Sequence, residues 1–151
     1  MGQELRVSKG AKGMKSTWAI GPLKLVLPEH VVENHFVVIN EGRISQICEA
    51  HELPQKCEIF ETKSSFKLFP GMIDQHIHGI AGADTMDGTK QSLEIISKAL
   101  AKHGVTSFLA TTMTADIPKL QQVVQTIFEQ KDSVSGAKIV GIHLEGPFIN
   151  P

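Results

Sequence analysis

The sequence predicts an α/β fold in which a small β module is followed by the first part of a β/α barrel. Up to about residue 66, short apolar segments are separated by turns. From residue 67 onward, strand-like segments alternate with segments of helical periodicity. In addition, histidines and a glutamate stand near the carboxyl ends of two predicted strands, which is where a β/α barrel carries its catalytic groups.

The β module is expected over residues 16–66. Its four predicted strands are short, apolar or alternating, and bounded by turn residues; they cover residues 23–27, 36–39, 43–47 and 58–60. The turn Asn40-Glu41-Gly42 joins the second and third of these segments. Residues 36–47 are therefore predicted to form a β-hairpin.

The barrel segment is expected over residues 67–151. Three apolar segments suit strands and cover residues 68–78, 106–113 and 138–144. Residues 90–102 place Ile96 and Leu100 on one side of a helix, and a second helix begins near Asp116. The apolar positions of this second helix are Ile117, Leu120, Val124, Ile127 and Phe128. Strands joined by helical crossovers run parallel, so we expect three parallel strands.

Composition and charge exclude several classes of protein. The 151 residues carry 15 Lys and Arg against 16 Asp and Glu, so the net charge of -1 does not favour nucleic acid or anionic lipid. No apolar run approaches the roughly 18 residues that cross a bilayer. Residues 1–15 are polar and basic, and we expect a disordered extension there. Without a signal sequence, Cys48 and Cys57 are expected to be reduced thiols in a cytoplasmic protein.

The segment Asp74-Gln75-His76-Ile77-His78 is the strongest chemical feature of the chain. Because successive side chains on a strand point to opposite faces, His76 and His78 share a face, with Asp74 one step below. Two neutral imidazoles on a rigid element are able to ligate one divalent metal. The alternative is a pair of buried histidines that are bonded to their neighbours. The glycine-rich loop that follows and the placement at a strand end favour the metal.

A second motif, GIHLEGP at residues 141–147, ends the third predicted strand. The same alternation puts His143 and Glu145 on one face, and Glu145 then projects into the same mouth as His76 and His78. We therefore expect His76, His78 and Glu145 to be metal ligands. Asp74 and His143 are expected to orient a ligand, to lie near the substrate, or only to complete the packing.

Four segments together resemble a known family. They are PGMIDQHIHG at 70–79, GADTMDG at 82–88, HGVTSFLATTM at 103–113 and GIHLEGPF at 141–148. The first resembles the first-strand motif of the amidohydrolase superfamily. The glutamate in HLEGP narrows the resemblance to the N-acetylglucosamine-6-phosphate deacetylases. The resemblance covers about residues 18–151.

The resemblance implies a (β/α)8 barrel of the TIM type with a small β-sandwich, and a hydrolase of a linear amide C–N bond. The implied substrate is an amino-sugar phosphate, N-acetylglucosamine 6-phosphate, which is converted to glucosamine 6-phosphate and acetate. The implied cofactor is one or two divalent ions, zinc or iron, and a homo-oligomer is also implied. No catalytic acid/base is expected in this chain, because the family's aspartate follows the eighth strand, beyond Pro151.

Three strands do not complete a barrel, which needs about 200–250 residues or more. We therefore expect the 151-residue chain alone to be inactive. Two alternatives stay open at this point. One is another superfamily member that cleaves cyclic amides, and the other is a truncated product without catalytic activity.

Overall fold

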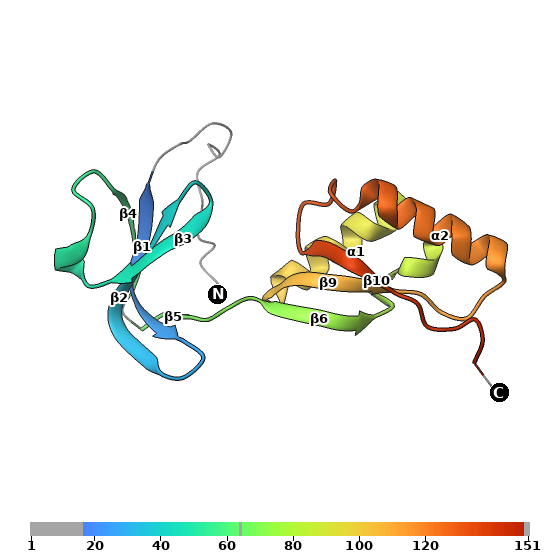
Figure 1. Cartoon of the computed structure of the whole chain (residues 1–151), viewed down its shortest axis with the longest axis horizontal. Helices are drawn as coiled ribbons and strands as arrows, with labels where there is room; N and C mark the ends of the chain where they lie inside the picture. The colour runs from blue at the N-terminus through green and yellow to red at the C-terminus, as the bar shows by residue number, and fades with distance from the viewer. Residues whose placement is uncertain (1–16, 64, 150–151) are drawn as a thin grey trace. The chain divides into compact units, whose positions relative to one another are not determined.

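A computed structural model describes residues 17–63 and 65–149 of the chain. The chain is a mixed α/β protein that divides into two compact units between Pro70 and Gly71 (Figure 1). The extension predicted for residues 1–15 lies outside the described residues. Within the described ranges, no helix has the length and apolar character that crossing a membrane requires.

The first unit is a five-stranded mixed sheet. Its strands are β1 (Trp18–Val26), β2 (Val31–Asn40), β3 (Arg43–Cys48), β4 (Glu58–Glu61) and β5 (Lys67–Leu68), with a 3-10 turn, η1, at Ala50–Glu52. The order is β3-β2-β1-β4, and β5 also pairs with β1. The predicted hairpin is confirmed, because β2 and β3 pair antiparallel around Glu41 and Gly42, whose φ angles are 50° and 75°.

The second unit is built on three parallel strands in the order β10-β9-β6, as the strand–helix alternation predicts. Its elements are β6 (Met72–Ile77), β7 (Gly79–Ile80), β8 (Ala83–Asp84), η2 (Thr85–Asp87), α1 (Lys90–Lys102), β9 (Val105–Thr111), α2 (Ile117–Gln130) and β10 (Lys138–His143). The short pair β7–β8 is an antiparallel hairpin that directly follows β6.

Both helices cover the same face of this sheet (Figure 1). Each begins at a capping side chain: Thr89 accepts a hydrogen bond from the Ser92 N–H, and Asp116 accepts one from the Lys119 N–H. The core between helices and sheet consists of fully or nearly fully buried side chains, chiefly Leu93, Ile96, Leu100, Phe108, Val123 and Ile127. This cluster fixes the strands against the helices and so provides a rigid base for the strand ends.

The predicted apolar face of the second helix is wrong at Ile117 and Phe128, whose side chains are 47% and 67% exposed. The buried positions of α2 are Leu120, Val123 and Ile127. Helical periodicity places Phe128 one residue, or about 100°, beyond Ile127, so packing Ile127 and Val123 against the sheet turns Phe128 outward.

Candidate metal centre

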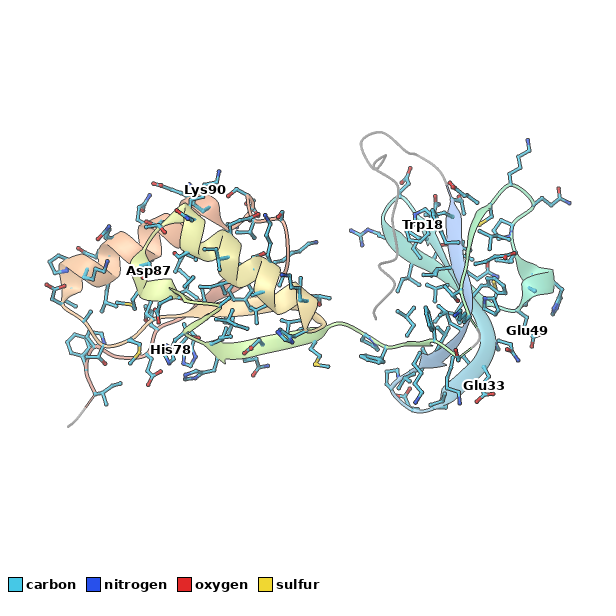
Figure 2. The ribbon with its side chains drawn as sticks, turned by 180° about the vertical axis from the view of Figure 1, so that it is seen from behind. Trp18, Glu33, Glu49, His78, Asp87 and Lys90 are labelled. Carbon is cyan, nitrogen blue, oxygen red and sulfur yellow. The ribbon has the colours of Figure 1, made fainter. Side chains whose placement is uncertain are left out.

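The carboxyl ends of the three parallel strands lie side by side at one level of the sheet. Ala110 in the middle strand pairs with Ile77 of β6 on one side and with Ile142 of β10 on the other. The histidines that flank Ile77 and the residues that follow Ile142 are therefore brought to the same edge. Figure 2 labels His78, which directly follows β6. This convergence of strand ends assembles residues that are far apart in the sequence.

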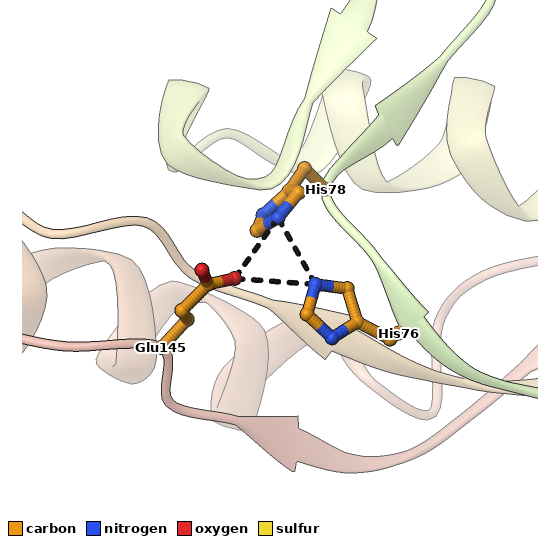
Figure 3. Close-up of side chains that lie close together, drawn as sticks. All are labelled: His76, His78 and Glu145. Carbon is orange, nitrogen blue, oxygen red and sulfur yellow. Dashed lines mark hydrogen bonds and ion pairs between the residues drawn. The ribbon is translucent and has the colours of Figure 1, made fainter.

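Three side-chain atoms form a nearly equilateral triangle at this edge (Figure 3). Nε2 of His76 and Nε2 of His78 are 3.2 Å apart, and Oε2 of Glu145 lies 3.1 Å from each of them. His76 is exposed, whereas His78 and Glu145 are partly buried. The sequence-predicted trio is thus brought together, with one ligand atom from each residue aimed at a common point.

The triangle fits a bound divalent ion. Ligands held at about 2.0–2.1 Å from one ion are about 2.8–3.4 Å apart when the angle between them lies between square and tetrahedral values. All three separations fall in this range. Two imidazoles and one carboxylate are a donor set that suits zinc or iron. Oε2 of Glu145 is also buried, and apart from the two histidine nitrogens it has no polar partner in the described part of the chain. A cation would satisfy this oxygen.

Asp74 supports the segment that carries the histidines. Between Asp74 and Ile77 the pairing of β6 with β9 slips, because three steps in β6 match two steps in β9. At this bulge the carboxylate of Asp74 accepts a hydrogen bond of 3.1 Å from the backbone N–H of His76. Asp74 therefore bonds to the backbone of His76, and it is not among the three convergent side chains.

His143 lies beside the triangle without joining it. Its ring meets that of His76 edge to face, with centroids 4.8 Å apart and an angle of 86° between the planes. His76 meets His78 in a similar way, at 5.0 Å and 87°. Because the rings of His78 and His143 both pack edge to face against it, the His76 ring is restricted in how far it can rotate. His143 thus limits the position of one corner of the triangle.

Glu145 follows β10 by two residues and depends on the glycine after it. Gly146 has a φ of 84°, and a side chain at this position would collide with Thr114. Because only glycine adopts this conformation at low cost and only hydrogen leaves room, the chain can turn directly after Glu145. The turn directs Glu145 towards the histidines.

Two further residues support the site through contacts to the backbone: Thr111, whose hydroxyl accepts a hydrogen bond from the Ile77 N–H, and Thr114, which packs against Gly146. No sequence pattern marks either contact, since each joins residues more than 30 positions apart.

A hollow of about 380 Å³, lined by Met72–Gln75 and Val105, lies toward the start of β6 and does not include the histidines.

Comparison with known proteins identifies the family of the chain. The model of the amidohydrolase family matches residues 68–151. The N-acetylglucosamine-6-phosphate deacetylase of Bacillus subtilis is 41% identical over 143 residues, which are 91% of this chain and 36% of that protein. The deacetylase of the same name from Vibrio furnissii is 46% identical over 82 residues, 54% of this chain and 21% of that protein.

Among solved structures, the crystal structure of N-acetylglucosamine-6-phosphate deacetylase from Pasteurella multocida superposes with a TM-score of 0.78. At 23% identity, over 89% of this chain and 35% of that one, this likeness concerns the fold. The chain spans about a third, or less, of the length of the curated relatives that it matches. The family match covers more than half of the chain and includes His76, His78 and Glu145, and we conclude that this chain belongs to the amidohydrolase family.

Proposed function

We propose that the enzyme to which this chain contributes removes acetate from N-acetylglucosamine 6-phosphate and leaves glucosamine 6-phosphate. The observation that carries the proposal is the triangle of His76, His78 and Glu145 at the strand ends. It is supported by the relative from Bacillus subtilis, whose name states this deacetylation and whose identity of 41% extends over 91% of the chain. The motif around Glu145, rather than the histidine pair alone, distinguishes this proposal from cleavage of a cyclic amide.

In this proposal His76, His78 and Glu145 hold a divalent metal ion, zinc or iron, as one of one or two ions. When bound, such an ion lowers the pKa of a water molecule towards 7 and polarises an amide carbonyl. The chain's own contribution is positional. Asp74 bonds to the backbone at His76, His143 limits rotation of the His76 ring, and Glu145 supplies the negative charge that offsets the charge of the cation.

The second ring nitrogen of His78, Nδ1, is the next feature of the proposed site. Nδ1 of His78 is buried and has no hydrogen-bond partner among the described residues. A histidine that ligates metal through one nitrogen usually donates a hydrogen bond from the other, which fixes the ring and raises its basicity. We propose that Nδ1 of His78 donates a hydrogen bond of this kind in the metal-loaded site.

We further propose that β6, β9 and β10 are the first three strands of a TIM-type (β/α)8 barrel, and that the first unit, which includes β5 and ends at Pro70, belongs to a small β-sandwich. Support comes from the sheet face opposite the helices, where Ile73 and Val140 are 63% and 58% exposed. In a closed barrel these side chains would become interior. The solvent-exposed Ile44 and Ile59 give similar support for a second sheet over β3 and β4.

The proposed compartment is the cytoplasm and the proposed partner is the small amino-sugar phosphate, with assembly into a homo-oligomer as the resemblance implies. Cys48 and Cys57 are both free thiols, which suits a reducing compartment. Burial raises the pKa of both thiols, so neither favours the reactive thiolate.

The metal site is tested first on the 151-residue chain by titration with Co²⁺, whose visible absorption reports coordination. The wild type should bind, and His76→Ala and Glu145→Gln should weaken binding by more than the 10–100-fold typical of supporting residues. His30→Ala is the matched control, because His30 is an exposed histidine in the first unit. Equal binding by wild type and His76→Ala would remove this residue from the site.

Activity is tested in a chimera in which this chain replaces the matching segment of the Bacillus subtilis deacetylase. Acetate release from N-acetylglucosamine 6-phosphate should require His76, His78 and Glu145, and should not require His30. The isolated chain should not turn over the substrate at the rate of the chimera. A chimera that folds and binds metal but keeps its rate after Glu145→Gln would refute the proposed role of Glu145.

A further inference from the structure

The bulge in β6 has a second anchor, which lies on the neighbouring strand. Thr111 is the last residue of β9 and is fully buried. Its Oγ1 accepts a hydrogen bond of 3.1 Å from the backbone N–H of Ile77, the residue between the two histidines. The same hydroxyl donates a hydrogen bond of 3.2 Å to the backbone carbonyl of Leu109. The threonine thus ties the H-x-H segment directly to the middle strand.

This contact replaces a backbone hydrogen bond that the bulge disturbs. A bulge leaves an extra residue out of the ladder, and its polar groups then need other partners. Two successive N–H groups are satisfied here by side chains, that of His76 by Asp74 and that of Ile77 by Thr111. The peptide plane between His76 and Ile77 is therefore set by Thr111, and the directions of both histidine side chains depend on it.

The hydrogen bonds of the Thr111 hydroxyl fix its orientation. Because its proton is committed to the Leu109 carbonyl, a lone pair remains to face the Ile77 N–H. A valine would have nearly the same shape and would leave this N–H without its acceptor. A serine would keep both hydrogen bonds. Comparing the valine and serine variants therefore distinguishes the effect of the hydrogen bonds from the effect of side-chain volume.

We propose that Thr111 is a positioning residue for the metal site, which holds His76 and His78 in register for one ion through the Ile77 N–H. The inference rests on the proposed function, since it assumes that these histidines bind metal. It predicts that loss of the hydroxyl acts on the histidines through the backbone, without any contact between Thr111 and a ligand atom.

The test uses the 151-residue chain with two readouts, Co²⁺ affinity and amide hydrogen exchange of Ile77 in the metal-free protein. Thr111→Val should lower Co²⁺ affinity about 10–100-fold and speed exchange of the Ile77 amide about 10-fold or more, as expected when a buried hydrogen bond is lost. Thr111→Ser should match the wild type in both. Thr106→Val is the matched control, because the Thr106 hydroxyl also bonds across to β6, at the Met72 carbonyl.

Equal Co²⁺ affinity or equal Ile77 exchange in Thr111→Val and wild type would overturn the proposal, as would a comparable loss in Thr106→Val. If Thr111→Val does not fold by circular dichroism, Thr111→Ser decides, and loss of affinity in that variant overturns the proposal. Failure of the wild type itself to bind Co²⁺ would refute the proposed metal site. The exchange readout then still shows whether Thr111 holds the bulge, so the two failures are distinguishable.

Discussion

Replacing Gly146 by alanine should displace Glu145 and weaken metal binding. The φ of Gly146 is 84°, and an alanine in this left-handed region costs about 1–2 kcal/mol. The added Cβ would also lie 3.1 Å from both Cα and Cβ of Thr114, and closer still to its hydroxyl oxygen. The hydroxyl can rotate away, but the Cα cannot.

The size of the displacement follows from these contacts. Ordinary contact of a Cβ begins at about 3.4 Å, so the loop must move by at least about 0.3 Å even after the hydroxyl has rotated. Metal–ligand distances tolerate deviations of about 0.2 Å. Because Glu145 is the adjacent residue and lies 3.1 Å from each histidine nitrogen, we expect a loss of Co²⁺ affinity of about 10-fold or more.

Gly104→Ala provides the matched control, since Gly104 has a φ of 81° and nothing within 4 Å of an added Cβ. Both variants should lose unfolding free energy in urea, about 1–2 kcal/mol for Gly104→Ala and more for Gly146→Ala, whose Cβ also collides with Thr114. Helical circular dichroism reports this loss for the second unit, which contains α1 and α2. Only Gly146→Ala should lose affinity, and Thr114→Ala in the same chain should restore part of it. Unchanged affinity in Gly146→Ala, or an equal loss in Gly104→Ala, would refute the reasoning.

Two further predictions concern stability. Ile127→Ala should lower the unfolding free energy by about 2–5 kcal/mol because Ile127 is 1% exposed. Its neighbour Phe128 is exposed, so Phe128→Ala should change the unfolding free energy by no more than about 0.5 kcal/mol. Similar urea midpoints for the two variants would contradict the helix register. Hydrogen bonds from Ser135 and Lys98 lower the pKa of Glu94 from 4.5 to about 2. The charged form therefore stabilises the fold above pH 4.5, and this contribution is lost as the pH falls towards 2. Glu94→Gln should accordingly be less stable than wild type at pH 7, and the difference should shrink over that window.

Local patterns were sufficient to predict most elements of the fold. The hairpin, both helices and the three parallel strands lie within a few residues of the predicted bounds, because each has a period and a turn of its own. The first strand was predicted too short, since it starts at Trp18 and runs through Gly21 and Pro22. Those two residues are usually read as the end of a strand. Pairing with β2, β4 and β5 extends it, and this pairing has no local signal.

The convergence of His76, His78 and Glu145 could also be predicted, because alternation on a strand and parallel strand ends are general rules. What could not be predicted is how the backbone is held there. The slip between Asp74 and Ile77 contradicts strict alternation along β6, and it depends on a partner in β9. Cross-strand contacts of this kind are chosen by the fold as a whole and leave no spacing in the sequence.

The middle strand explains why ligands from two separated strands can meet. Neighbouring strands are about 4.8 Å apart, so β6 and β10 are separated by roughly twice that distance, with β9 between them. Side chains that approach from β6 and β10 can meet only if no large side chain at the end of β9 projects between them. Thr111, the last residue of β9, is small and fully buried, and the Ala110 side chain points the other way, into the core below the helices. The residues that make the site are therefore those of the spacer strand as well as the ligands on either side. We infer that a large side chain at this level would separate Glu145 from the histidines even if all three ligands were kept.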